Sequence, residues 1–392
     1  MKDVFIVSGA RTPVGKRNGY LRDYTVPVLL GKVLDAVADR AGVEPGVIDD
    51  VVVGTVYQLG EQGFTLARTG VYASRYPDSV PGMSVNRQCG SGLSAVQIGY
   101  GMIASGVMDV VVAGGCEMMT KYPIASDMNG TLFNGMPMGH PMAEYYVKRV
   151  NGHLWDQMNA AQQIAYKYGI TSGECMEFAV ASHKNAARAT ENGWFRKEIV
   201  PVEGKDKDGN AIVQDRDETV RPDTSVEKLA TLQPVSGTEF ITAGISSPVT
   251  DGASAVLLMG GDKVRELGLS PLARVVANAV VGSEPDLMLT GPIIATPKVL
   301  KKAGLALNDI DLFEVNEAFA PIPLAWAKEL GADREKLNVN GGAIALGHPV
   351  GSSGTRLVLT AACELQRRKA RYALITLCTG VAMAPATIIE RV

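Results

Sequence analysis

The last third of this 392-residue chain repeats the pattern of its first third. Apolar runs and the polar turns that follow them recur in the same order. The matched segments are 309–315 with 48–53, 338–340 with 84–86, and 372–377 with 109–113. Self-similarity at a separation of about 250 residues predicts two copies of one α/β unit. The chain is also too long for one simple core, which predicts two or three domains.

Strand-like and helix-like segments alternate within the first copy. Residues 4–7, 51–54 and 109–115 are expected to form buried strands, and Val26–Ala41 has the spacing of an amphipathic helix. Strands that alternate with helices predict a mainly parallel sheet covered on both faces. Two such units would pack with their loop ends converging, where a shared site is expected.

The middle of the chain follows a different pattern. Methionine, glycine and proline crowd residues 118–142, and a helical stretch at 174–192 precedes an Asp208-Gly209 turn that predicts a hairpin. We therefore expect an insertion, and inserted loops on a rigid body often carry the ligand site. The expected parts are an N-terminal half of residues 1–117 plus 248–270, an inserted loop domain of residues 118–247, and a C-terminal half of residues 271–392.

Composition excludes several classes of function. A net charge of −3 argues against a nucleic-acid partner, which would require a strong basic excess. No apolar run approaches the roughly 18–20 residues of a membrane span. The five cysteines are scattered without a C-x-x-C pair, which disfavours a zinc site or a disulfide framework and fits a reducing compartment. Because residues 1–7 resemble a first strand and not a signal peptide, we expect a cytoplasmic protein.

Cys89 lies in a turn that is suited to reactive chemistry. It stands in Asn-Arg-Gln-Cys-Gly-Ser-Gly, and the apolar spacing from Leu93 to Ile103 predicts a helix directly after it. The free N–H groups and partial positive charge of a helix N-terminus favour a thiolate, so we expect a lowered pKa for Cys89. The alternative is a buried structural cysteine that merely precedes a helix.

The second copy places further reactive side chains after its own strands. His348 lies in a glycine-dense loop between Gly347 and Pro349, Asn316 follows one predicted strand, and Cys378 follows another. In parallel α/β sheets, ligands bind outside the carboxyl ends of the strands. We therefore expect Cys89, Asn316, His348 and Cys378 to share that edge.

Four separated motifs resemble those of a known family, the thiolases, also called acetyl-CoA acetyltransferases or 3-ketoacyl-CoA thiolases. The motifs are 86–92 (NRQCGSG), 316–319 (NEAF), 341–351 (GGAIALGHPVG) and 378–380 (CTG). The resemblance implies an α/β fold with two duplicated βαβ-type halves in an α-β-α-β-α layered body. It also implies that the inserted loop domain holds coenzyme A, and that the protein is a homodimer or homotetramer.

The resemblance further implies acyl transfer between acyl-CoA and acetyl-CoA, as 3-ketoacyl-CoA thiolysis or as the reverse condensation to acetoacetyl-CoA. Cys89 would be the nucleophile that carries the acyl group as a thioester. His348 would remove its proton, and Cys378 would exchange a proton with the acetyl-CoA enolate. One oxyanion hole would use His348 and a water held by Asn316. The other oxyanion hole would use the backbone N–H groups of Cys89 and Gly380.

Contacts with coenzyme A, the co-substrate, follow from the same resemblance. Arg221 matches a segment near the adenine and phosphate end, and Ser247 matches a serine near the pantetheine arm. Met288 and Phe319 would line the acyl pocket, with plain core packing as the alternative. The resemblance implies neither a metal nor a permanently bound cofactor.

The sequence departs from the family at two places. Residues 381–384 (Val-Ala-Met-Ala) replace a run of glycines after Gly380, and the stretch 120–159 fits the family poorly. Both departures bear on the preferred length of the acyl chain, which stays open. The physiological direction of the reaction also stays open. Three alternatives also stay open: a ketoacyl synthase, against which Cys378 argues, a cysteine hydrolase of another fold, and a non-catalytic thiolase-like scaffold that binds acyl-CoA.

Overall fold

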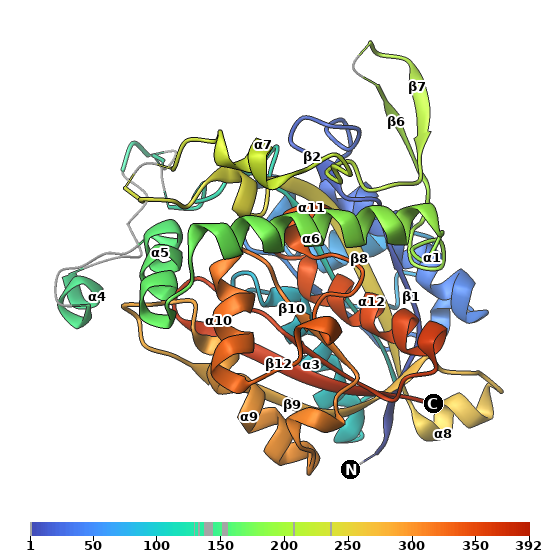
Figure 1. Ribbon diagram of the computed structural model, residues 1–392. Helices are drawn as coiled ribbons and strands as arrows, with labels where there is room; N and C mark the ends of the chain where they lie inside the picture. Colours follow the sequence, from blue (N-terminus) through green and yellow to red (C-terminus); the bar gives the residue numbers. More distant parts are fainter. Residues whose placement is uncertain are drawn as a thin grey trace.

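The computed structural model describes residues 2–128, 130–131, 134–136, 144–150, 156–206, 208–235 and 237–392. One ten-stranded sheet crosses the whole molecule (Figure 1). Its first half contains β1 (Val4–Arg11), β2 (Gly15–Lys16), β3 (Asp50–Gly54), β4 (Gly82–Val85), β5 (Val110–Met118) and β8 (Thr250–Gly260). Its second half contains β9 (Ala273–Gly282), β10 (Leu312–Val315), β11 (Tyr372–Thr376) and β12 (Met383–Arg391).

The two halves of the sheet meet at a short seam. The strand order is β10-β11-β12-β9-β1-β8-β5-β3-β4, with β2 beside β8. Only two residue pairs, Phe5 with Arg274 and Ile6 with Ala273, join β1 to β9. The sheet is therefore two units connected edge to edge.

The sheet is mixed, so the expectation of a mainly parallel sheet was wrong. The pairs β3–β4, β3–β5 and β10–β11 are parallel, whereas β8 and β12 run antiparallel to every strand with which they pair. The chain passes from β11 to β12 through the short loop 377–382, and a connection of that length cannot make the crossover that a parallel pair needs.

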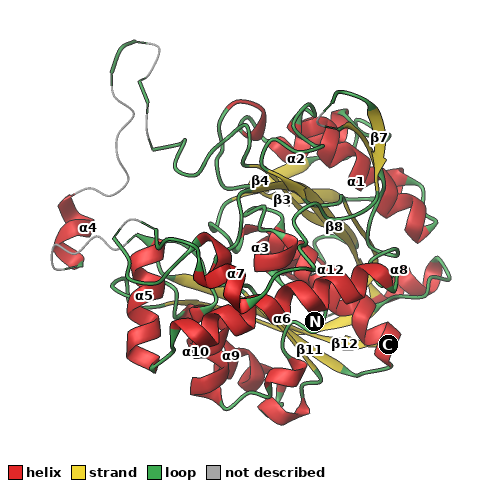
Figure 2. Cartoon of the chain, turned by 45° about the horizontal axis from the view of Figure 1, so that its top comes forward, coloured by secondary structure: helices red, strands yellow, loops and turns green. Residues whose placement is uncertain are grey.

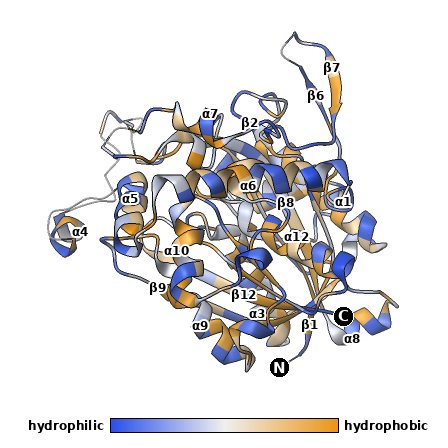
Figure 3. Ribbon diagram, in the orientation of Figure 1, coloured by the Kyte–Doolittle hydropathy of each residue, from blue (hydrophilic) through white to orange (hydrophobic). Residues whose placement is uncertain are grey.

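Helices form three layers around the two halves of the sheet (Figure 2). The central layer is α3 (Ser91–Ala104) against α12 (Ser353–Arg368), and both helices contact strands of both halves. The outer layers are α1 (Val26–Ala41) with α2 (Leu66–Tyr72), and α9 (Gly291–Ala303) with α10 (Pro321–Leu330). This arrangement confirms the predicted α-β-α-β-α body, and apolar residues gather on the strands and inner helix faces (Figure 3).

The structure also confirms the internal duplication. The segments β3, β5 and α3 of the first half correspond to β10, β11 and α12 of the second. The counterpart of β4 is reduced to one parallel bridge between Phe313 and Leu337. Each central helix therefore follows a parallel strand or bridge in the chain, α3 after a short turn and α12 after the longer loop 338–352.

Local signals set the helix ends that the sequence predicts. Helix α1 spans Val26–Ala41 as expected, with proline in its first turn and Gly42 ending it at φ +67°. In α6 (Ser172–Glu191), the side chains of Thr171 and Glu174 form a reciprocal capping box. These caps satisfy backbone groups that a helix end leaves without partners.

The middle region leaves the body and returns at adjacent points, because Met118 at the end of β5 pairs with Asp251 near the start of β8. Its hairpin, predicted around Asp208-Gly209, projects from the body (Figure 1). Parts of the irregular stretch 118–142 lie outside the described residues, and the three-part domain division stays a prediction. The elements of this region are α4 (Glu144–Arg149), α5 (Gln157–Tyr168), α6, β6 (Val202–Lys205), β7 (Ala211–Gln214) and α7 (Val226–Ala230).

The remaining helices are short: α8 (Gly261–Glu266) after β8, and α11 (Ala343–Leu346) before the His348 loop. Among the described residues, no helix is long and apolar enough to cross a membrane.

Candidate active site

The Cys89 turn lies at the contact between the two halves. Cys89 follows β4 and precedes Gly90, the N-cap of α3, and its side chain is buried. A Cβ on Gly90 would lie 2.8 Å from Pro385 Cγ and 2.9 Å from Thr379 Cγ2, so only glycine allows the turn to approach the second half this closely. Cys89 is therefore next to the loop that carries Cys378.

His348 and Asn316 form a buried pair in the second half. Asn316 follows β10, and its Nδ2 lies 3.3 Å from His348 Nε2. The His348 backbone N–H donates to Thr250 Oγ1 at 2.9 Å, which ties the histidine loop to β8 of the first half. Val350, two residues after His348, packs in one apolar cluster with Cys89. The His348 loop therefore faces the Cys89 turn.

Cys378 and Gly380 complete the group from the end of β11. Both residues are buried, and the backbone N–H of Gly380 is close enough to the Cys89 sulfur to act on the pKa of that thiol. Burial, followed by negative charge on Cys89, raises the pKa of Cys378, and the second cause requires the two sulfur atoms to lie within electrostatic reach. The structure thus brings together Cys89, Asn316, His348, Cys378 and Gly380.

The prediction that Cys89 has a lowered pKa was wrong. Burial raises the pKa of the Cys89 thiol to about 11, and the backbone N–H groups of Gly380 and of Cys89 itself oppose this only in part. Glu117 adds a smaller upward contribution. Desolvation exceeds the effect of the helix terminus because the second half covers the turn. Near neutral pH, Cys89 is therefore a protonated thiol, which would need a base in order to act as a nucleophile.

His348 is in the state that a base requires. Burial, followed by the nearby positive charge of Arg356, lowers the pKa of His348 to about 3. The imidazole is therefore neutral near pH 7, with one nitrogen free to accept a proton. Burial also raises the pKa of Cys378, so this second thiol also keeps its proton near neutrality instead of titrating there as a free cysteine would.

Glu117 was missed by the sequence reasoning. This buried carboxylate accepts N–H groups from Val56, Tyr57 and Gly351 and the side-chain amide of Gln62, at 2.6–3.1 Å. It thereby fixes the loop after β3 to the histidine loop of the other half. The available signal was an acidic residue inside the apolar run of β5.

The loop after Gly380 has a strained backbone. Val381 and Ala382 both have positive φ, at +61° and +55°, and so does Gln88 at +50°. A β-branched residue in the left-handed region is an outlier, and such strain concentrates at functional sites. A Cβ on Gly380 would lie within 3.3 Å of the amides of Gln88 and Gln157, so this loop also borders α5 of the insertion.

Replacing Val381 with glycine is expected to stabilise the protein. Glycine adopts φ +61° without the steric cost that valine has there. That steric cost exceeds the entropic cost of introducing glycine by about 1 kcal/mol. Urea denaturation should therefore show a higher free energy of unfolding for Val381→Gly. The matched control is Val213→Gly in β7, an exposed valine without positive φ, which should lower it. Equal losses in both variants would contradict the strain.

A second prediction concerns acid stability. His183 is buried and accepts the N–H of Arg221, and burial lowers the pKa of His183 to about 4. Between about pH 4.5 and pH 6, the unfolded chain binds a proton there that the folded chain does not, so stability falls as the pH falls. We expect His183→Asn, which keeps an acceptor, to reduce this slope by up to about 1.4 kcal/mol per pH unit. Urea titrations across that range measure it, and an unchanged slope would refute it.

The residues predicted to contact coenzyme A lie in two places. Ser247 donates its N–H to the carbonyl of Ala318 at 2.9 Å, beside Phe319, and Phe319 shares a buried cluster with Met288 and Cys378. Arg221 is exposed, and its side chain makes no hydrogen bond or ion pair with the described residues. Three of the four residues thus lie toward the Cys378 side, and Arg221 lies apart from them.

Comparisons with known proteins cover nearly the whole chain. The family pattern described as thiolase, N-terminal domain matches residues 4–262, and that described as thiolase, C-terminal domain matches residues 269–391. A 3-ketoacyl-CoA thiolase of Bacillus subtilis is 42% identical over 402 residues and covers 100% of both chains. A steroid 3-ketoacyl-CoA thiolase of Mycobacterium tuberculosis is 41% identical and covers 100% of this chain and 95% of its own.

Solved structures agree with these relatives. The crystal structure of the Bacillus anthracis acetyl-CoA acetyltransferase has a TM-score of 0.91 at 36% identity, covering 100% of this chain and 99% of its own. The human mitochondrial 3-ketoacyl-CoA thiolase has a TM-score of 0.89 at 36% identity, with the same coverage. Two family patterns that span both halves, together with relatives above 40% identity, establish that the chain belongs to the thiolases, a family of acyltransferases.

Proposed function

We propose that this protein transfers an acyl group between acyl-CoA and acetyl-CoA through a thioester on Cys89. The observation that carries the proposal is the meeting of two buried thiols with a neutral imidazole at the contact between the halves. A nucleophilic thiol, a base and a second proton carrier are what 3-ketoacyl-CoA thiolysis and the reverse condensation require.

His348 acts on Cys89 in the first step. Its neutral Nε2 accepts the thiol proton as the sulfur attacks the acyl carbon, because a thiol of pKa about 11 does not ionise unaided near neutrality. The N–H groups of Gly380 and Cys89 act on the Cys89 sulfur and are the donors proposed for the oxygen that becomes negative on the attached carbon. Each such donor contributes about 100- to 1000-fold in rate.

Cys378 acts on the acetyl-CoA partner. It keeps its proton near neutral pH, so it can give that proton to the departing enolate in thiolysis, which leaves a thiolate. In condensation the same step runs in reverse, and the Cys378 thiolate takes the α-proton to become the thiol again. Asn316, 3.3 Å from His348, supports the enolate oxygen together with that histidine through a water. A ketoacyl synthase is disfavoured as the alternative because a thiol occupies the position of Cys378.

Coenzyme A is the proposed co-substrate. Ser247, fixed next to Phe319, lies along the pantetheine arm, while Phe319 and Met288 border the acyl group near Cys378. Arg221 has an exposed guanidinium that is free to meet the phosphate end. The described residues thus offer both a buried acyl side and an exposed basic group.

A panel of 3-ketoacyl-CoA substrates of rising chain length tests the proposal. We expect CoA-dependent cleavage of at least one member, measured as acetyl-CoA release. A protein that binds acyl-CoA without cleaving any member would instead be a non-catalytic scaffold. The same assay run with acetyl-CoA alone reports condensation.

We also propose that the protein is cytoplasmic. We further propose that two copies of the chain associate through the β4 edge of the sheet. Strand β4 is the last strand of its side of the sheet, and Phe64 and Tyr72 beside it are 96% and 63% exposed. An unpaired edge with exposed aromatic residues fits a second copy of the chain. Light scattering should give a dimer or tetramer, and Phe64→Glu with Tyr72→Glu should shift it toward monomer.

A further inference from the structure

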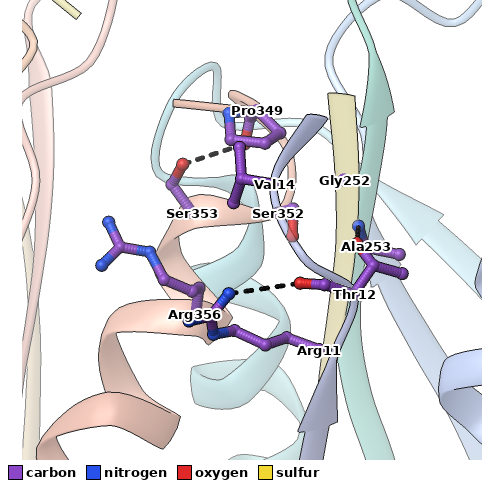
Figure 4. Close-up of a pocket in the computed structure, with 9 residues that line it drawn as sticks. All are labelled: Arg11, Thr12, Val14, Gly252, Ala253, Pro349, Ser352, Ser353 and Arg356. Carbon is purple, nitrogen blue, oxygen red and sulfur yellow. Dashed lines mark hydrogen bonds between the residues drawn. The ribbon is translucent and has the colours of Figure 1, made fainter. Parts of the chain in front are cut away.

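The second ring nitrogen of His348 has a dedicated partner. His348 Nδ1 lies 2.6 Å from the hydroxyl of Ser353, the first residue of α12. The Ser353 hydroxyl also lies 2.9 Å from the carbonyl of Pro349, to which it donates. Figure 4 shows this serine directed toward Pro349, while Ser352 lies on the side of Gly252 and Ala253.

These contacts agree on one tautomer of the imidazole. Because the Ser353 hydroxyl proton points to Pro349, its oxygen accepts the proton of His348 Nδ1. The amide nitrogen of Asn316, which can only donate, faces His348 Nε2. Nε2 must therefore carry a lone pair and no proton. Nε2 is therefore the nitrogen that can accept a proton.

We propose that Ser353 is a positioning residue that holds the proton on His348 Nδ1, so that Nε2 receives the proton of Cys89. The proposal rests on the function proposed above and deepens it. In that step the S–H bond breaks, an Nε2–H bond forms, and the Nδ1–H bond to Ser353 stays in place throughout. No other proton has to move at the ring.

The surroundings explain why this bond matters. Burial and the charge of Arg356, one turn further along α12, both disfavour the imidazolium that forms when Nε2 is protonated. The guanidinium of Arg356 is buried and has no hydrogen-bond partner among the described residues, and its charge is opposed only without direct contact, by the carboxyl groups of Glu314, Asp217 and Glu198. The contact between Nδ1–H and Ser353 is a hydrogen bond that strengthens when the ring becomes charged.

The test compares two adjacent serines. Ser353→Ala removes the acceptor of Nδ1–H, and Ser353→Thr restores a hydroxyl. Ser352→Ala is the matched control, because Ser352 is also buried in the same turn but bonds to Ser254 of β8 at 2.9 Å instead of to His348. If Ser353→Ala does not fold, Ser353→Cys replaces it, because a thiol is a poor acceptor.

We expect the rate of Cys89 acylation by acetyl-CoA to fall about 10- to 100-fold in Ser353→Ala, with KM nearly unchanged. Ser353→Thr should recover most of the rate, and Ser352→Ala should keep it while losing thermal stability. Nitrogen-15 spectra of histidine-labelled protein, assigned by difference against His348→Asn, should show unprotonated Nε2 in the wild type. They should show a mixture of tautomers in Ser353→Ala.

Two outcomes would overturn the proposal. One is a Ser353→Ala protein that acylates at the wild-type rate with the wild-type nitrogen spectrum. The other is an equal loss of rate in Ser352→Ala and Ser353→Ala, which would make the effect one of packing. Failure of the proposed function is distinguishable, because in that case the wild-type protein would form no acyl adduct on Cys89 at all.

Discussion

Cys89→Ala is expected to form no acyl adduct when mixed with acetyl-CoA or acetoacetyl-CoA. The wild-type protein should gain one acyl group on the peptide that contains Cys89, located by mass spectrometry. Turnover should fall by about 10⁴- to 10⁶-fold, as when a covalent nucleophile is removed from other enzymes. The physical reason is that the other thiol of the site, Cys378, keeps its proton near neutral pH and exchanges it with the enolate, so it does not replace Cys89 as the acyl carrier.

The control for this experiment is Cys363→Ala. Cys363 is partly exposed, whereas the other four cysteines are buried, so it is the thiol most open to adventitious acylation. We expect this variant to keep the adduct and the activity. An adduct that persists in Cys89→Ala, or one that disappears in Cys363→Ala, would remove Cys89 from the proposed role.

Cys378→Ala is expected to separate two steps of the reaction, acylation of Cys89 and the making or breaking of the C–C bond. Acylation of Cys89 should continue, because His348, Gly380 and the backbone N–H groups remain in place. Formation and cleavage of the C–C bond should fall by about 100- to 10,000-fold, because no group then exchanges a proton with the enolate. Rapid quenching followed by mass spectrometry measures acylation, and acetoacetyl-CoA absorbance measures condensation.

Cys175→Ala is the matched control for this variant. Cys175 is also a buried thiol of the same large apolar cluster, but it lies on α6 of the insertion and not in the loop after β11. Its removal should affect stability alone. If Cys378→Ala condensed acetyl-CoA at the normal rate, the proton-transfer role assigned to Cys378 would be wrong.

The local pattern of the chain predicted many of the elements, and the resemblance to the thiolases implied the order of the layers. Helix α1 has the expected bounds, β3 and β10 form from the repeated apolar runs, and a helix follows Cys89 directly. These features depend on side-chain periodicity, caps and glycines within about ten residues, which a sequence displays directly. The same information placed Cys89, Asn316 and Cys378 beyond strand ends.

Strand direction was not available from the same pattern. The sequence shows that β8 and β12 are apolar, but not that each runs against its neighbours. Direction depends on how the preceding loop returns to the sheet, and in β8 that loop is the whole insertion. The expectation of a mainly parallel sheet failed for this reason.

The sequence by itself determined which residues carry reactive atoms and that two similar halves would bring them to strand ends. Only the tertiary structure decided their chemical state. The thiol of Cys89 has a raised pKa, contrary to the effect of its helix terminus, because a loop almost 300 positions away in the chain covers it. Glu117 and Ser353 likewise gained their roles from partners in three dimensions, since desolvation and hydrogen bonding depend on contacts that no local stretch of sequence contains.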